Sequence, residues 1–285
     1  MAAPVIEHFY FIYNPLTKTV KTMKRFLTFA LAAALFSSCS DDDDNQIVTP
    51  VTPGEMSLTL DARIGNEDFA LNKDFAVAGQ TLNFNKLRYW VSNVVLVDTK
   101  GAEYKVPDSY FLMEEVSDLD LSGTINDKMT YPANKRETIT LKNIPAGEYK
   151  TIKFGIGVDS KYNDNLSLRT GELTIANGMS NIAWMWHSSY LFTSVGGTVK
   201  KGADSKAFTA ETGLNANYKT VSIDLPTPVN SSTSKGFVLN LDVIKVFDGI
   251  DVMANPAINA MTAPLMSTVS TNYATKAIIF GSEAK

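Results

Sequence analysis

From Met56 onward the chain alternates apolar and polar side chains, and this period of two restricts the possible folds more than any other feature. The stretch "SLTLDARI" at residues 57–64 alternates strictly. The run "KLRYWVSNVVLVD" at residues 86–98 is rich in β-branched and aromatic residues, which favour strands. On a strand, one set of its side chains lies on a common face, namely Leu87, Tyr89, Val91, Val95 and Val97.

Later segments repeat this pattern, at residues 137–159, 181–195, 218–225 and 236–247. The first of them contains a turn at Pro145-Ala146-Gly147 between two strands. Seven to nine short strands separated by turn residues favour an all-β fold, an antiparallel β-sandwich of the immunoglobulin-like or Greek-key type. We expect little helix, near the C-terminus within residues 250–266, where Pro256 and Pro264 would break it.

We expect residues 1–38 to lie outside the folded domain. Met23 is followed by two basic residues, an apolar run at residues 26–36 and small residues, which is the pattern of a secretory signal peptide. The apolar run is too short to span a bilayer. We interpret residues 1–22 as an upstream extension of this signal.

Cys39, the single cysteine of the chain, stands where the signal ends. The run "LFSSC" resembles a bacterial lipobox, in which the cysteine is lipidated, and Asp41–Asp44 resembles the export signal of surface lipoproteins of Bacteroidetes-type bacteria. The sequence therefore predicts a lipid anchor at Cys39 in the outer membrane, a solvated tether at residues 39–55 and a folded domain at residues 56–285. We expect display at the cell surface, with a periplasm-facing anchor as the alternative.

The charge of the predicted mature chain argues against several classes of partner. The full chain of 285 residues has a net charge of −4, and removing residues 1–38 takes away four basic residues and one acidic residue, which leaves −7. An acidic chain without a basic cluster argues against nucleic acid and against electrostatic binding to anionic lipid. With Cys39 lipidated, no thiol is left for a disulfide, so the domain must be stabilised by its core.

Two of the three tryptophans adjoin the single histidine of the predicted domain, in "NIAWMWHSSYLF" at residues 181–192. On a strand, Trp184 and Trp186 share one face, as expected for the interior of a sandwich, whereas Met185 and His187 share the other. A thioether and an imidazole two positions apart suit copper, above all Cu(I), better than calcium or magnesium. The alternative is that the aromatic residues pack in the core and His187 is an ordinary surface residue.

Three blocks of the sequence, "KLRYWVSNVVLVDTKG", "PAGEYKTIKFGIGVDSKYN" and "MSNIAWMWHSSYLFTSVGG", occur in the order that is typical of the MbnP-like copper-binding proteins. The chain resembles this family over most of residues 56–280. The resemblance implies a surface protein that binds copper for acquisition or handling, with a dihaem peroxidase-type enzyme as a partner. In some members a tryptophan oxidised to kynurenine contributes to the copper site, and Trp184 and Trp186 match the tryptophans of the family motif.

The sequence also departs from the family pattern. Family members carry a histidine near the start of the domain, where this chain has "SLTLDARIG", and another in an F-x-x-H-x-G motif, where it has "FTAETG" with Glu211 in the histidine position. The resemblance therefore leaves His187, Met185, Trp184, Trp186 and Glu211 as candidate copper ligands. Either these residues form a different copper site, or copper binding has been lost.

A second candidate site is the loop "GVDSKYNDN", which offers carboxylate and amide oxygens from Asp159, Asn163, Asp164 and Asn165. Such oxygens bind calcium when six to eight of them converge. The spacing differs from that of an EF-hand loop, and Asp and Asn are common in loops because they favour turns. The sequence is compatible with both interpretations.

The sequence carries no enzyme signature that we recognise. It has no G-x-S-x-G elbow, P-loop, H-E-x-x-H motif or cysteine–histidine pair. We therefore expect a protein that is not an enzyme. The alternative to copper binding is a recognition module for polysaccharide or protein, with an exposed Trp90 or Trp186 as a stacking platform.

Overall fold

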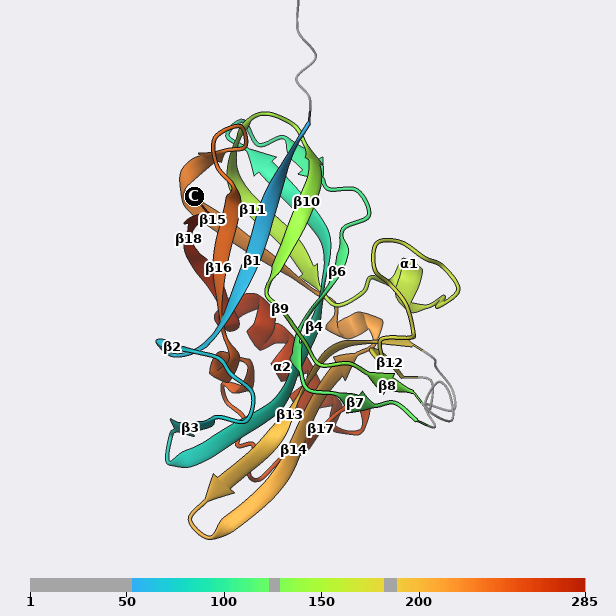
Figure 1. Cartoon of the computed structure of the whole chain (residues 1–285), viewed down its shortest axis with the longest axis vertical. Coiled ribbons are helices and arrows are strands. Elements are labelled where there is room, and N and C mark those ends of the chain that lie inside the picture. The colour runs from blue at the N-terminus through green and yellow to red at the C-terminus, as the bar shows by residue number, and fades with distance from the viewer. Residues whose placement is uncertain (1–52, 123–128, 182–188, 285) are drawn as a thin grey trace, which may run out of the picture. The chain divides into compact units, whose positions relative to one another are not determined.

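The computed structural model describes residues 53–122, 129–181 and 189–284, and these residues form an all-β fold, as the sequence predicts (Figure 1). Cys39, the predicted signal peptide and most of the predicted tether lie outside the described residues. Among the helices that the structure describes, none is long and apolar enough to cross a membrane.

The strands form two principal sheets. The first contains β10 (Thr138–Ile144), β1 (Gly54–Ile64), β16 (Gly236–Asp242) and β18 (Ile278–Ala284) in this order, with β2 (Glu67–Asp68) paired to β1. The main path of the second sheet runs through β15 (Lys219–Asn230), β11 (Glu148–Ile156), β4 (Gln80–Asp98), β13 (Ser189–Lys201), β14 (Asp204–Gly213) and β17 (Ala257–Ile258). Beside this path lie β3 (Asp74–Val77), β5 (Glu103–Lys105), β6 (Tyr110–Val116), β9 (Asn134–Arg136) and β12 (Ser180–Asn181). A separate pair consists of β7 (Leu119–Asp120) and β8 (Thr130–Tyr131).

Most strand pairs are antiparallel, as predicted, but two are parallel. Strand β1 runs parallel to β16, and β14 runs parallel to β17. The predicted number of strands is too low, because the described residues contain eighteen strand segments. Many of the additional strands are too short for alternation along the sequence to reveal them.

At Asn93 the alternation of side chains along strand β4 is shifted by one residue, so that positions that would point outward point into the core. Before this residue, the predicted side chains of Leu87, Tyr89 and Val91 are buried in the core between the sheets. At Asn93 the backbone adopts a φ of 50°, and the pairing of β4 with β11 shifts register nearby. Beyond this bulge Val94 and Leu96 enter the core, so the prediction that Val95 and Val97 share a face with the residues before Asn93 is wrong.

Helices are few and gather mainly near the C-terminus, as predicted. The longest, α2 (Ala263–Asn272), continues into the π-helical η4 (Tyr273–Ala277). It lies further along the chain than predicted, because Pro264 occupies its first turn, where a proline favours a helix instead of breaking it. The remaining helices are short, namely α1 (Ser160–Asn163), η1 (Asn215–Asn217), η2 (Val243–Phe247) and η3 (Ala260–Thr262).

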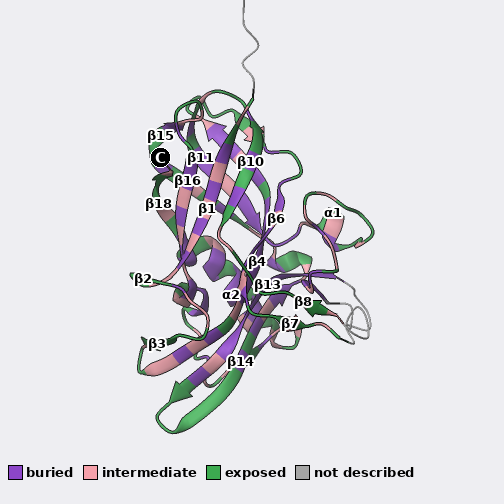
Figure 2. Cartoon of the chain, in the orientation of Figure 1, coloured by how far each residue is buried: buried purple, intermediate pink, exposed green. Residues whose placement is uncertain are grey.

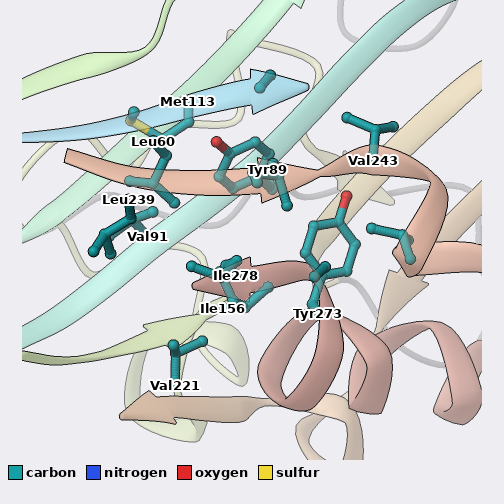
Figure 3. Packing of buried hydrophobic residues seen from close by; sticks show 14 of the residues in the cluster. Leu60, Tyr89, Val91, Met113, Ile156, Val221, Leu239, Val243, Tyr273 and Ile278 are labelled. Carbon is teal, nitrogen blue, oxygen red and sulfur yellow. The ribbon is translucent and has the colours of Figure 1, made fainter. Parts of the chain in front are cut away.

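The main hydrophobic core combines residues from both sheets and from the C-terminal helices (Figure 3). Leu60 and Leu239 from the first sheet belong to it together with Tyr89 and Val91 from the second. The ring of Tyr273 in η4 lies 6.0 Å from that of Tyr89, measured between centroids. The helical C-terminal segment therefore helps to complete the core.

A second, smaller core lies on the opposite face of the second sheet. Its buried members are Trp90, Tyr110, Leu112, Val158, Leu173, Met179, Tyr190, Leu191 and Phe192. Figure 2 shows how burial varies along the strands, and β14 changes from exposed at its start to buried at its end. This second core surrounds the beginning of β13 and positions the candidate site.

Candidate functional site

Trp184, Met185, Trp186 and His187 lie outside the described residues, but the residues on either side of them are described. Asn181 in β12 pairs with Ser189 in β13, and Ser180 pairs with Tyr190. The two ends of the segment 182–188 are therefore held together as neighbouring strands. Tyr190, which follows the segment, is fully buried in the second core.

The Asp- and Asn-rich loop is attached to the start of β13. The Oδ1 atom of Asn163, a fully buried residue, accepts a hydrogen bond of 2.9 Å from the backbone N–H of Tyr190. Its Nδ2 donates to Asn215 Oδ1 at 2.8 Å, and Asn215 Nδ2 in turn donates to both carboxylate oxygens of Asp164 at 2.9 Å. The structure thus brings the predicted calcium loop next to the start of β13, which follows the predicted copper segment, although the loop and the segment lie apart in the sequence.

The other oxygens of this loop already accept hydrogen bonds from the protein. Asp159 caps α1 by accepting from the backbone N–H of Lys161 at 3.1 Å, and it also accepts from Asn93 Nδ2 and the Tyr110 hydroxyl. Asn165 accepts from Ser167. Among the described residues, no three His, Cys, Asp or Glu side chains are close enough to hold a metal ion together. The hydrogen bonds of Asp159 and Asn165 to residues two positions further along are those that the turn-forming interpretation predicts.

A row of five residues crosses the second sheet on the face of the second core. Strand pairing places them directly opposite one another in the order Arg136, Glu114, Arg88, Ser194 and Glu211. Residues directly opposite in an antiparallel sheet project from the same face. We call this set the polar row, and Glu211 stands at its end.

At the centre of the polar row, Arg88 and Glu114 form a buried ion pair. Arg88 Nε donates to Glu114 Oε2 at 2.8 Å, and the two side chains are only 2% and 1% exposed. Glu114 Oε1 also accepts from the Tyr131 hydroxyl at 2.5 Å and from Asn134 Nδ2 at 2.8 Å. Burial and this contact with a carboxylate raise the pKa of Tyr131 to about 12.

Sequence reasoning missed this ion pair. The available signal was Arg88 in the middle of an apolar strand, on the face that also carries Trp90. Charged side chains are almost never fully buried without a partner, so its position called for a buried carboxylate. Nothing in the sequence indicated that Glu114 supplies it.

A cavity of about 320 Å³ opens beside the ion pair, and Glu114, Tyr131 and Asn134 line part of it. Its wall includes Arg136, which contacts Glu172 through two hydrogen bonds of 2.6 and 2.8 Å. The charges of this described lining are therefore paired within the protein. The cavity offers a metal ion no unpaired carboxylate among these residues.

Glu211 is already in contact with a cation. Its Oε1 atom lies 3.3 Å from Lys86 Nζ and accepts a hydrogen bond of 3.1 Å from Ser194 Oγ. Glu211 lies opposite Ser194, which is five residues, or about 17 Å of extended strand, beyond Ser189. Asn163 and its neighbour Asp164 lie nearer to the start of β13 than Glu211 does.

Trp90 is not an exposed stacking platform, and that part of the alternative prediction is wrong. The residue is fully buried in the second core, where its ring lies 5.9 Å from that of Tyr190. Its Nε1 donor finds no hydrogen-bond partner among the described residues. Burial follows from the strand itself, because both faces of β4 are covered at this point.

Comparisons with known proteins add an independent finding. A family model described as MbnP matches residues 53–262. Among solved structures, the chain is similar to "MbnP from Methylosinus trichosporium", with 18% sequence identity and a TM-score of 0.46, over 70% of this chain and 78% of that one. No curated protein matches the chain.

Proposed function

This chain belongs to the MbnP family, and from that premise we propose that it binds copper through the segment that contains Met185 and His187. The protein handles or acquires copper and does not catalyse a reaction. A thioether and a neutral imidazole form a donor set suited to Cu(I). Trp184 and Trp186 lie in the same segment and contribute to the site directly or after oxidation.

The observation that supports this proposal best is that strand pairing and a buried hydrogen bond hold the residues on either side of the segment in place. The pairing of Asn181 with Ser189 closes a short connection that carries both soft donors. Asn163, with Asn215 and Asp164 behind it, fixes the backbone of Tyr190 through a buried hydrogen bond. A metal site needs ligands on a supported backbone, and these contacts provide that support.

Competition with a Cu(I) chelator tests the proposal, using the wild type and single variants. We expect the wild type to take copper from the chelator, His187→Ala to abolish tight binding and Met185→Leu to weaken it. Because imidazole binds metal only when neutral, affinity falls on acidification. Asp164→Asn tests whether the carboxylate near the start of β13 contributes.

Two results would contradict the copper proposal. If the wild type takes no copper from the chelator, the copper proposal is wrong. If tight binding survives His187→Ala, the copper site lies elsewhere in the protein. In the first case the recognition module remains, with Trp186 as its platform because Trp90 is buried. A dihaem peroxidase-type partner is part of the same proposal, and oxidation of a tryptophan in its presence would show as a change in intact mass.

We also propose that Cys39 carries a lipid that anchors the protein in the outer membrane, with the domain at the cell surface. Changing Cys39 to Ala removes the acceptor, so we expect the variant to leave the detergent phase in which the wild type partitions. Protease treatment of intact cells then distinguishes a surface-exposed domain, which is degraded, from a periplasmic one, which is protected. Unchanged partitioning of the variant excludes the lipid anchor.

A further inference from the structure

The side chain of Lys86 crosses a neighbouring strand to reach Glu211. Lys86 lies on β4 opposite Gly196 of β13, and Glu211 lies on β14, on the far side of β13. Lys86 Nζ is 3.3 Å from Glu211 Oε1, with both side chains about three-quarters buried, at 23% and 27% exposure. The ion pair therefore spans three strands of the sheet.

Gly196 leaves room for this crossing. A Cβ atom at this position would lie 2.9 Å from Lys86 Cε and 3.3 Å from its Cγ, so the lysine side chain would have to shift. The absence of a side chain leaves a channel across β13 that the aliphatic part of Lys86 fills. The φ of Gly196 lies outside the left-handed region, so the backbone conformation itself does not call for a glycine.

The described surroundings of Glu211 supply positive charge and a donor from several sides. Besides Lys86, Ser194 Oγ donates to the same carboxylate oxygen at 3.1 Å. Arg88 stands opposite Ser194 in the polar row, although its Nε is engaged by Glu114. Lys86 and Ser194 both engage the Oε1 atom of Glu211, so a metal ion that binds this oxygen must displace the ammonium group of Lys86.

We propose that Lys86 is a built-in competitor for cations at Glu211, so that this ion pair takes the place of metal ligation there. The inference rests on the proposed function only in that Glu211 stands among the candidate copper ligands. It predicts that Glu211 does not ligate copper while Lys86 is present. Removing Lys86 should uncover a latent cation site.

The experiment uses the detergent-solubilised full chain and titration with Cu(II) alone as the probe. The variants are Glu211→Gln, Lys86→Met and the double variant. Lys153→Met is the matched control, since Lys153 pairs with Glu103 at 2.8 Å in the same sheet. A further variant, Gly196→Ala, displaces Lys86 and keeps its charge.

We expect Glu211→Gln to leave the Cu(II) affinity of the wild type unchanged. Lys86→Met should raise the affinity at least about twofold, the size expected from releasing one partly buried ion pair. The increase should disappear in the double variant and be absent from Lys153→Met, whereas Gly196→Ala should show part of it. This pattern identifies Glu211 as the group that Lys86 protects.

Two outcomes overturn the inference: a clear loss of affinity in Glu211→Gln alone, or no increase in Lys86→Met. Neither outcome depends on Cu(I) binding by the wild type. If the chelator competition shows no Cu(I) binding while Lys86→Met still gains a Cu(II) site through Glu211, the proposed function fails and this inference stands. Failure of the proposed function and failure of this inference can therefore be told apart.

Discussion

Arg88 and Glu114 are opposite charges within the sheet, and each is almost completely removed from solvent. Their hydrogen bonding is unequal. Glu114 receives three donors, from Arg88, Tyr131 and Asn134, whereas the Nη2 atom of Arg88 finds no partner among the described residues. A buried charge without an opposite charge beside it is strongly destabilising, so Arg88 and Glu114 each depend on the other to remain charged in the core.

Removing one member of this pair should be costly. We expect Arg88→Met to lower the free energy of unfolding by about 3–5 kcal/mol, because it leaves the Glu114 carboxylate buried without its counter-ion. Adding Glu114→Gln to Arg88→Met should recover part of the loss, since the amide oxygen still accepts from Tyr131 and Asn134 without a buried charge. Urea unfolding of the three proteins measures both effects.

Lys153→Met provides the control at an exposed ion pair of the same sheet. We expect it to change the free energy of unfolding much less than Arg88→Met does, because solvent screens exposed ion pairs. Equal losses from Arg88→Met and Lys153→Met would show that burial of the Arg88 pair has no energetic consequence.

At the scale of elements, Asn93 connects the bulge in β4 to the loop around α1. Its Nδ2 donates to Asp159 Oδ2 and to the Tyr218 hydroxyl, both at 2.9 Å, and its Oδ1 accepts from the Tyr110 hydroxyl. Its backbone lies in the left-handed region, which asparagine tolerates better than most residues. One residue therefore changes the inward face of a long strand and attaches the loop that supports β13.

Two substitutions separate these contributions. Asn93→Gly removes the side-chain hydrogen bonds but leaves the backbone unstrained, because glycine adopts a positive φ readily. Asn93→Ala removes the same hydrogen bonds and adds backbone strain. We expect both to destabilise the domain, with Asn93→Ala worse by about 1 kcal/mol in urea unfolding. Equal stability of the two variants would show that the positive φ carries no strain.

At the scale of the whole molecule, several tyrosines keep their protons to unusually high pH in the folded state. Burial raises the pKa of Tyr89 and of Tyr273 in the main core. Burial and a hydrogen bond to Asp159 raise the pKa of Tyr110, and burial with Glu114 raises that of Tyr131 to about 12. The two cores take Tyr89, Tyr110 and Tyr273 out of water, whereas Tyr131 lies beside the buried carboxylate of Glu114.

This arrangement predicts a loss of stability in alkali. The unfolded chain loses its phenolic protons near pH 10, whereas the folded chain retains them, so the stabilisation is complete below pH 10 and decreases above it. Each fully buried tyrosine should reduce the free energy of unfolding by up to about 1.4 kcal/mol per pH unit between pH 10 and its folded pKa, and the partly exposed Tyr131 should reduce it by less. For Tyr131 this interval ends near pH 12.

Urea unfolding at pH 8, 9, 10 and 11 measures the decrease. Tyr131→Phe is the informative variant, because it removes one titrating group and should make the decline less steep above pH 10. A decline of equal slope in the variant would mean that Tyr131 is not held protonated by the fold.

The sequence by itself determined the all-β class, the main strands and the turn between β10 and β11. These features follow from alternation and turn chemistry, which act between neighbouring residues and are visible in any short window. The predicted signal and lipid site are likewise local patterns, and they stay predictions because they lie outside the described residues. Local covalent geometry is sufficient for all of these inferences.

Tertiary structure alone decided the remaining features. The sequence predicts one common side-chain face on both sides of Asn93, and pairing with β11 revealed the bulge that reverses Val95 and Val97. The parallel pairing of β1 with β16 joins segments far apart in the chain. Partner choice between strands depends on the shared core that they close, and no short window of sequence contains both partners.

The candidate site shows the same division. The sequence identified the Met185–His187 segment and the Asp- and Asn-rich loop as separate candidates, and the fold joined the loop to the start of β13 through Asn163. The sequence also offered Glu211 as a ligand, and the fold placed Lys86 beside it. A side chain's chemical type is encoded at its own position, but its charge state and availability depend on neighbours that only the packed sheet brings into contact.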